Sequence, residues 1–336
     1  MTLPHFRLLR PATLPEALEA LAAPGATALG GGTDLLVALK QRRIRPDLLV
    51  DLTALAELGR VDRWQDGITI GAGVKVADVH ESVARRPGLA ALEEAAASLG
   101  SPPLRNSATV GGNLCLPPRC LFFNQSEFWR GSTGLCFKTG GEVCLAAPAS
   151  RRCLASFAAD LPPALMVLGA WVRVARWDGA RMIGREMPLE DLYFDDGLAW
   201  LRLEPGEVVA GVRIPVVKDL RSGYRKYRRR GSIEFPLAGI AASLRLQDGV
   251  MRDVRVVAGA LASAPLWAGE AMALLEGRRP EPALLDEAAA LVTRGTRPAR
   301  NQGDTPGQRR EVARVMCRRL LADLTVAEWR GEEATG

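Results

Sequence analysis

Apolar positions along the first 53 residues follow helical and strand spacings in turn. Apolar residues three and four positions apart predict a helix over 14–22, which a Pro-Gly pair ends. The short apolar runs ATAL (26–29) and DLLVDLT (47–53) predict strands. Between them, GGGTDLLVALK has the pattern of a glycine turn that leads into a helix. Strand, helix and strand in this order predict an α/β unit.

The patterns resume further along the chain and change character near the C-terminus. They predict a strand, a turn and a helix start (67–79), a helix closed by Gly100 (88–100), a loop with a second glycine turn (101–114), a helix that turns into a strand (162–177), strands (206–215, 236–246 and 252–262) and helices (281–293 and 308–324). The basic segment 218–235 is interpreted as a boundary. Strands followed by helices after this boundary predict an α+β domain.

One polar stretch, residues 116–154, shows neither period. It holds four of the six cysteines of the chain, namely Cys120, Cys136, Cys144 and Cys153. Thiolates bind zinc or the iron of iron–sulfur clusters. Zinc sites usually contain C-x₂₋₄-C pairs, which this stretch lacks, whereas wide spacings suit a chain wrapped around a larger [4Fe–4S] cube. The spacing alone leaves a cluster, a zinc site and unligated cysteines open. Cys115 and Cys317 are predicted to be small buried residues.

The composition narrows the class of function and the compartment. The chain has a formal charge of +6, but its basic residues are spread along the sequence, which argues against nucleic-acid binding and favours acidic partner subunits. The N-terminal segment lacks the apolar core of a signal peptide, and no run reaches the roughly 18 apolar residues that span a bilayer. We therefore expect a cytoplasmic protein, in which disulfides are disfavoured.

Two glycine-rich segments, one aspartate and one lysine are candidates for cofactor binding. GGGTD (30–34) and TVGGN (109–113) allow the backbone to approach a ligand closely, although neither matches a Rossmann or a Walker motif. Asp160 precedes Leu-Pro-Pro and is interpreted either as a ligand of a ribose hydroxyl or as a helix N-cap. Lys226 is either a cofactor contact or part of a solvated basic face. Neither of the two histidines belongs to a hydrolase motif.

Five segments extend in order from residue 11 to about residue 265: PATLPEALEALAAPGATALGGGTDLLVALK, RNSATVGGNLC, AADLPPAL, GEVVAGVRIP and YRKYRRRGSIEFPLAG. Together they resemble the FAD-binding subunit of molybdenum hydroxylases, a family that includes the medium subunit of carbon monoxide dehydrogenase and the flavin domain of xanthine dehydrogenase. The resemblance implies an α+β fold. A two-subdomain FAD-binding domain of the PCMH (vanillyl-alcohol oxidase-like) type is expected over 1–55 and 56–217. A C-terminal α+β domain of the CO dehydrogenase flavoprotein type is expected over 218–336.

The same resemblance implies where FAD binds. The pyrophosphate is expected at the two glycine-rich segments, the ribityl-ribose region at Asp160 and the isoalloxazine near Lys226. The expected FAD contacts are Leu29, Gly30, Gly31, Gly32, Thr33, Asp34, Leu35, Thr109, Gly111, Gly112, Asn113, Asp160 and Lys226. No catalytic residue is expected in this chain, because the resemblance places the molybdenum cofactor and the substrate on another subunit.

The cysteine-containing stretch is an insertion relative to most of the family. There, GGNLC is followed almost directly by the segment with the aspartate, whereas about 40 residues separate the two here. The insertion resembles an extra loop in the flavin subunit of 4-hydroxybenzoyl-CoA reductase, which carries a [4Fe–4S] cluster. The resemblance implies that the four cysteines ligate such a cluster. It also implies electron transfer in a ferredoxin-linked reductive dehydroxylation of an aromatic acyl-CoA to benzoyl-CoA.

The implied partners are a large subunit with molybdopterin, a small subunit with two [2Fe–2S] clusters, and a ferredoxin or a similar donor. The expected assembly is a heterohexamer of two heterotrimers. Two alternatives remain: the flavin subunit of an oxidative hydroxylase of the xanthine or CO dehydrogenase type, and a zinc-binding structural subunit. The insertion's aromatic residues are expected to pack against the cluster rather than to dock a donor. They are Phe122, Phe123, Phe128 and Trp129.

Overall fold

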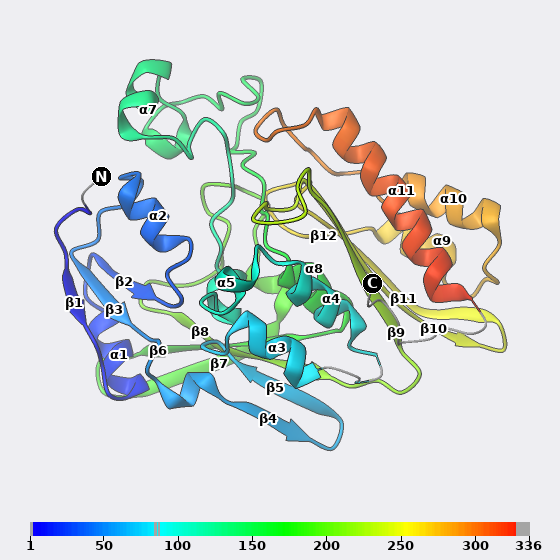
Figure 1. Cartoon of the computed structure of the whole chain (residues 1–336), viewed down its shortest axis with the longest axis horizontal. Helices are drawn as coiled ribbons and strands as arrows, with labels where there is room; N and C mark the ends of the chain where they lie inside the picture. The colour runs from blue at the N-terminus through cyan, green and yellow to red at the C-terminus, as the bar shows by residue number, and fades with distance from the viewer. Residues whose placement is uncertain (1–2, 84–85, 87, 327–336) are drawn as a thin grey trace.

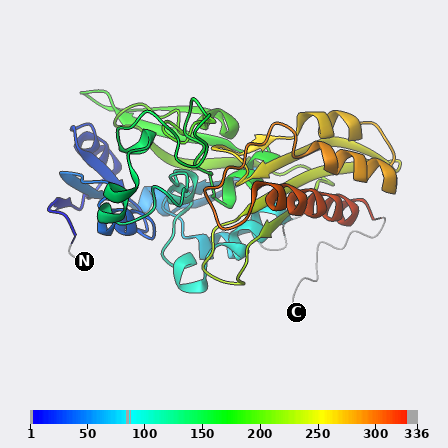
Figure 2. The ribbon, with the colours of Figure 1, turned by 90° about the horizontal axis from the view of Figure 1, so that it is seen from above.

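The computed structural model describes residues 3–83, 86 and 88–326. These residues form three sheets with their helices, which follow one another along an elongated molecule (Figures 1 and 2). The predicted domain ends at residues 1 and 336 lie outside the described residues. Within the described part of the chain, no helix has both the length and the apolar character that crossing a membrane requires.

The first sheet follows the predicted α/β unit. Its parallel strands lie in the order β1 (Arg7–Leu9), β3 (Leu48–Asp51) and β2 (Ala26–Leu29). Helix α1 (Leu14–Leu21) begins after Thr13, whose hydroxyl accepts a hydrogen bond from the N–H of Glu16. The apolar face of α1 packs into a small core with β3 and with residues of the second sheet. Helix α2 (Leu35–Lys40) follows the glycine turn.

The second sheet is antiparallel, in the order β4-β5-β8-β6-β7, and its helices cover one face (Figure 1). The strands are β4 (Val61–Trp64), β5 (Gly67–Gly71), β6 (Trp171–Trp177), β7 (Met182–Pro188) and β8 (Val208–Pro215). The α-helices are α3 (Val76–Val83), α4 (Ala90–Ser98), α5 (Pro102–Arg105), α6 (Val110–Leu114) and α8 (Leu161–Val167), and the 3₁₀ turns are η1 (Ala56–Gly59) and η3 (Leu189–Leu192). The largest hydrophobic core lies between this sheet and the helices.

The third sheet is also antiparallel and carries the C-terminal helices. The order is β12 (Leu266–Trp267), β11 (Val250–Gly259), β10 (Ala238–Gln247) and β9 (Arg221–Tyr227). Helices α9 (Gly269–Leu275), α10 (Pro282–Leu291) and α11 (Pro306–Thr325) pack against it in a separate core. Strands followed by helices confirm the α+β prediction for this part of the chain.

The insertion rises beside α2, away from the sheets (Figure 1). It contains a short helix, α7 (Glu127–Thr133), and a 3₁₀ turn, η2 (Phe137–Thr139). The carboxylate of Glu127 forms an ion pair with Arg45, just after α2. The Arg130 guanidinium donates to the carbonyl oxygens of Gln41 and Arg42 at 3.3 and 3.1 Å. The insertion is therefore held against the first α/β unit.

One prediction about local structure is wrong, and one basic segment contains an element that the sequence did not indicate. Segment 101–114 is not a loop, because it contains α5 and α6. Helix α6 forms despite its two glycines, since the Thr109 hydroxyl caps it by accepting a hydrogen bond from the Gly112 N–H at 3.2 Å. The basic segment 218–235 contains β9, whose charged side chains have partners: Arg225 pairs with Glu94 at 3.0 Å. The interpretation of this segment as a domain boundary stays a prediction. Charges that find partners can lie in a strand, which composition alone does not reveal.

Candidate functional site

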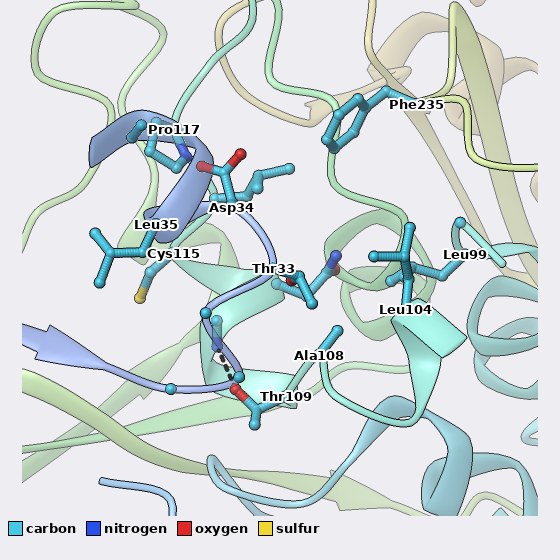
Figure 3. A pocket seen from close by; sticks show the side chains of 18 of the residues that line it. Thr33, Asp34, Leu35, Leu99, Leu104, Ala108, Thr109, Cys115, Pro117 and Phe235 are labelled. Atoms are coloured by element: carbon cyan, nitrogen blue, oxygen red, sulfur yellow. Dashed lines mark hydrogen bonds between the residues drawn. The ribbon is translucent and has the colours of Figure 1, made fainter. Parts of the chain in front are cut away.

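A cavity of about 490 Å³ is lined by segments from all three parts of the chain. The first α/β unit contributes residues 30–35, the second part contributes residues around α4 to α6 together with Asp160, and the third contributes residues 233–235. Figure 3 shows the side chains of Cys115 and Leu35 on one side of the cavity and those of Leu99 and Leu104 on the other. The volume lies within the roughly 300–1,000 Å³ of small-molecule and cofactor sites.

The two glycine-rich segments pack against each other at one wall of this cavity. A Cβ at Gly30 would lie 2.9 Å from the Thr109 hydroxyl oxygen, and one at Gly31 would lie 1.8 Å from the carbonyl oxygen of Ser107. Such distances are shorter than any that real Cβ atoms keep, so this close approach of the two loops requires glycine. The loops that the sequence singles out separately therefore form one structure.

The first glycine segment presents free backbone donors. Within the described part of the chain, the N–H groups of residues 30–34 have no protein acceptor. Successive N–H groups in a turn form a concavity that binds anions such as phosphate oxygens. The Asp34 carboxylate at the end of this segment forms an ion pair with Arg119, so its negative charge is neutralised. The segment fits a cofactor that carries a pyrophosphate.

Asp160 lies in the cavity wall, within a buried polar cluster. Its Oδ1 accepts a hydrogen bond from the Tyr224 hydroxyl at 2.8 Å, and its Oδ2 is 3.0 Å from the Nζ of Lys226. The Lys226 ammonium also donates to the carbonyl oxygen of Ser98 at 3.1 Å. Burial raises the pKa of the Asp160 carboxyl and lowers the pKa of Lys226, while the attraction between the two charges acts against both changes.

Asp160 occupies the N-cap position that the sequence predicts, but its side chain does not cap the helix that follows, α8. The side chain of Asn113 takes that part, because its Oδ1 accepts a hydrogen bond from the N–H of Leu161 at 3.1 Å. The second glycine segment is thereby tied to the start of α8, and Asp160 is left to face Tyr224, Lys226 and the cavity.

The end of the cavity next to the insertion has unpartnered donors. Phe123 and Lys138 of the insertion line it together with Arg43 and Trp200. Within the described residues, Nε and Nη2 of Arg43 and Nε1 of Trp200 are buried without a hydrogen-bond partner. Burial, together with the nearby Arg130, lowers the pKa of Arg43 to about 10. Buried polar atoms are rarely left unpaired, so these donors point to acceptors on a bound molecule.

The four cysteines of the insertion gather around a second, very small cavity of about 10 Å³. Phe122, Phe123 and Phe137 complete most of its apolar wall. None of the four forms a disulfide. Burial raises the pKa of the Cys120 thiol to about 11, and it also raises the pKa of Cys153. In the part of the chain that the structure describes, no three Cys, His, Asp or Glu side chains already have the arrangement of a metal site.

The aromatic residues of the insertion divide into two groups. Phe122 and Phe123 line the thiol cavity as predicted, and the Trp129 ring lies 6.3 Å from the Phe122 ring. Phe128 does not pack against the cysteines, since 88% of its surface is exposed on α7. The packing interpretation therefore fits the first group and fails for Phe128.

Most of the predicted FAD contacts lie in one place. Gly30–Leu35, Thr109, Gly112, Asn113 and Asp160 line the large cavity, whereas Leu29, Gly111 and Lys226 lie outside its lining. Cys115 lines this cavity and its pKa is raised to about 12 by burial, while Cys317 is fully buried in the C-terminal core. Sequence reasoning missed the lining residues Leu99, Leu104, Ile233, Phe235 and Trp200, which carry no local motif.

Two family models together match most of the chain. The model described as FAD binding domain in molybdopterin dehydrogenase matches residues 4–217. The model described as CO dehydrogenase flavoprotein C-terminal domain matches residues 222–324. The predicted fold, an FAD-binding domain followed by an α+β domain of the CO dehydrogenase flavoprotein type, is therefore confirmed.

Curated proteins and solved structures agree with these matches. The chain is 24% identical to the glyceraldehyde dehydrogenase medium chain of Sulfolobus acidocaldarius, over 96% of this chain and 99% of that one. It is 32% identical to the aldehyde oxidoreductase FAD-binding subunit PaoB of Escherichia coli, over 76% of this chain and 80% of that one. A chain of Cu,Mo-CO dehydrogenase has the same fold, with a TM-score of 0.78, 24% identity and coverage of 96% and 99%.

Proposed function

This chain belongs to the family of FAD-binding subunits of molybdopterin dehydrogenases, and from that premise we propose that it transfers electrons between bound FAD and a partner subunit. The substrate reaction and the molybdenum cofactor would lie on a large partner subunit, with iron–sulfur clusters on a small one. The observation that carries the proposal is the cavity at which two glycine-rich loops meet and free backbone donors line the wall.

The proposed FAD contacts follow from that cavity. The N–H groups of residues 30–34 would bind the pyrophosphate, and Asp160 would face the ribityl-ribose region. Bound FAD would accept and release electrons singly or in pairs, which suits a relay between a two-electron reaction and one-electron carriers. The role of this chain is to bind and orient the flavin, and to shield it from solvent.

A pair of glycine variants tests the site. Gly31→Ala would place a Cβ 1.8 Å from a backbone carbonyl oxygen, so the two loops must separate. We expect the purified variant to contain less than a tenth of the FAD of the unaltered chain. Gly59→Ala is the matched control, because a Cβ at Gly59 meets nothing within 4 Å. Full FAD occupancy of Gly31→Ala would contradict the assignment of this cavity to FAD.

The direction of electron flow is best proposed as oxidative, with electrons leaving the substrate subunit through FAD. The relatives are named for glyceraldehyde dehydrogenase, aldehyde oxidoreductase and CO dehydrogenase. These names support the oxidative alternative better than the predicted 4-hydroxybenzoyl-CoA reductase. The native complex, purified through a tag on this chain, can be mixed without oxygen with an aldehyde or with CO. Bleaching of the flavin absorbance is the expected result.

The reductive function remains a second candidate because of the insertion. Four cysteines from separate positions converge on one small cavity, beside the FAD cavity, although their side chains are not yet in the arrangement of a metal site among the described residues. We propose that Cys120, Cys136, Cys144 and Cys153 hold a [4Fe–4S] cluster, which would supply one-electron transfer. The small size of the cavity means that the thiols must move apart around such a cluster.

Metal analysis separates the readings of the insertion. About four iron atoms per chain and a broad iron–sulfur absorbance are expected, and Cys136→Ser should lose both. One zinc and no iron would support the zinc interpretation instead. The reductive candidate needs a further result: the purified complex must reduce 4-hydroxybenzoyl-CoA with a low-potential donor such as a reduced ferredoxin. Failure of that reaction, with flavin bleaching by an aldehyde or by CO, leaves the oxidative function.

A further inference from the structure

Two residues of the insertion form a shared wall between the two cavities. Phe123 and Lys138 line the FAD cavity, and both also line the cavity of the four thiols. No other residue that the structure describes is common to the two linings. One aromatic ring and one ammonium group therefore lie between the two cavities.

The Lys138 ammonium has little to neutralise or bind it. Its Nζ lies 5.0 Å from the centre of the Phe123 ring and 5.5 Å from that of Trp200. One hydrogen bond, to the carbonyl oxygen of Pro118, is long at 3.4 Å. Among the described residues, no carboxylate forms an ion pair with it. An ammonium has three donors, and a charge held away from water is costly unless an anion compensates it.

The surroundings add positive charge instead of removing it. The Arg43 and Arg130 guanidinium carbons lie 5.9 and 5.7 Å from the centre of the same Phe123 ring. The groups that can supply negative charge are the four cysteines, because they line the small cavity together with Lys138. Thiolates that ligate iron would place this negative charge beside the ammonium.

We propose that Lys138 is an electrostatic positioning residue, whose fixed positive charge stabilises the reduced form of the iron–sulfur cluster held by the four cysteines. The inference rests on the cluster proposed above. When one electron from a low-potential chemical reductant enters the cluster, the cluster gains one negative charge, and the ammonium lowers the free energy of that state. The side chain transfers no proton and touches no substrate. Its charge sets how readily the cluster accepts an electron next to FAD.

The test is a potentiometric titration of the purified, iron-loaded complex, followed by electron paramagnetic resonance of the reduced cluster. Lys138→Met keeps the length of the side chain and removes its charge. We expect it to shift the reduction equilibrium at least tenfold toward the oxidised cluster, which is a fall of about 59 mV for one electron. Lys138→Arg keeps the charge and should stay within threefold of the unaltered protein.

Control variants and outcomes separate this inference from the cluster itself. Lys40→Met removes a charge from an exposed position on α2 and should leave the potential unchanged. An unshifted potential in Lys138→Met with a full iron content overturns the role of Lys138 alone. A chain without iron overturns the cluster and this role together. If Lys138→Met fails to hold iron, retention of iron by Lys138→Arg supports the need for the charge, and loss of iron from both variants contradicts it.

Discussion

Removal of the charge of Lys226 tests how the buried pair of Lys226 and Asp160, beside the large cavity, is balanced. The side chains of Lys226 and Asp160 are only 3% and 4% exposed. In Lys226→Met the Asp160 carboxylate keeps one hydrogen bond, from Tyr224, while the Ser98 carbonyl oxygen keeps its other donor, Arg228. An unpaired buried charge costs about 3–5 kcal/mol of the free energy of unfolding. Asp160→Asn should cost a similar amount, because it leaves the ammonium buried with Ser98 alone.

The double variant Asp160→Asn/Lys226→Met should be more stable than either single variant. Neither position 160 nor position 226 then carries a charge, and the amide oxygen introduced at position 160 can still accept the hydrogen bond of Tyr224. Burial disfavours the charged forms of both side chains, because they lose their hydration. Much of the attraction between the two charges only offsets this cost, so the intact pair adds little net stability. We expect the two single effects to exceed the double effect by at least about 2 kcal/mol.

The pH dependence has a definite sign. The pKa of Asp160 is raised on folding, so the folded chain binds this proton more tightly than the unfolded chain does. Its contribution to stability is therefore complete below the unfolded pKa and is lost as the pH rises through the folded pKa. In Lys226→Met no ammonium opposes this shift, so the variant should lose more stability on going from pH 5 to pH 8 than the unaltered protein does.

Urea denaturation of the FAD-free chain, followed by circular dichroism, measures these free energies. Arg294→Met is the matched control, because its ion pair with Glu270 spans 2.7 Å but its partners are 66% and 60% exposed. Exposed pairs contribute about 0–1 kcal/mol. Strict additivity of the Lys226 and Asp160 variants, or a loss in Lys226→Met no larger than in Arg294→Met, would refute the argument.

Three further changes have defined outcomes. Arg43→Met removes buried donors that have no partner among the described residues, so FAD titration should show affinity reduced about tenfold or more while the free energy of unfolding stays within about 0.5 kcal/mol. Arg309→Met should lower that free energy by at least about 3 kcal/mol in urea denaturation, because this fully buried guanidinium donates to the carbonyl oxygens of Leu237 and Ala299. Phe128→Ala should change thermal stability by less than about 0.5 kcal/mol, since its ring is exposed, and a larger loss would show that the ring packs in the folded chain.

The sequence predicts the elements whose own residues decide their structure. Helix α1 follows from apolar spacing and a threonine cap, and the α/β unit follows from short apolar runs with a glycine turn between them. The sequence did not predict strand β9, because its arginine and lysine side chains find partners in distant parts of the chain, such as Glu94 and Asp160. Local composition cannot show whether a charge will be paired.

Some residues of the candidate site are indicated by the sequence, and others only by the fold. Glycine segments 30–34 and 109–113 are visible in the sequence, because each must leave room for a close neighbour. Only the folded structure shows that these two glycine segments pack against each other. Apolar residues such as Leu99, Ile233 and Phe235 line the same cavity without any local sign of it, since an ordinary apolar residue serves a cavity wall and a core equally well.

The position of the cysteines beside the large cavity depends on contacts that span much of the chain. At the base of the insertion, Arg119 and Ser156 exchange backbone hydrogen bonds of 2.6 and 2.8 Å, which close the loop between them. Asn301 of the C-terminal domain binds both sides of this base: its carbonyl oxygen accepts from Leu121 at 2.9 Å, and its side-chain amide donates to Leu154. The C-terminal domain therefore does more than extend the fold. Its contacts hold both ends of the insertion, so a chain that lacked this domain would keep the spacing of the cysteines but lose the contacts that place them beside the large cavity.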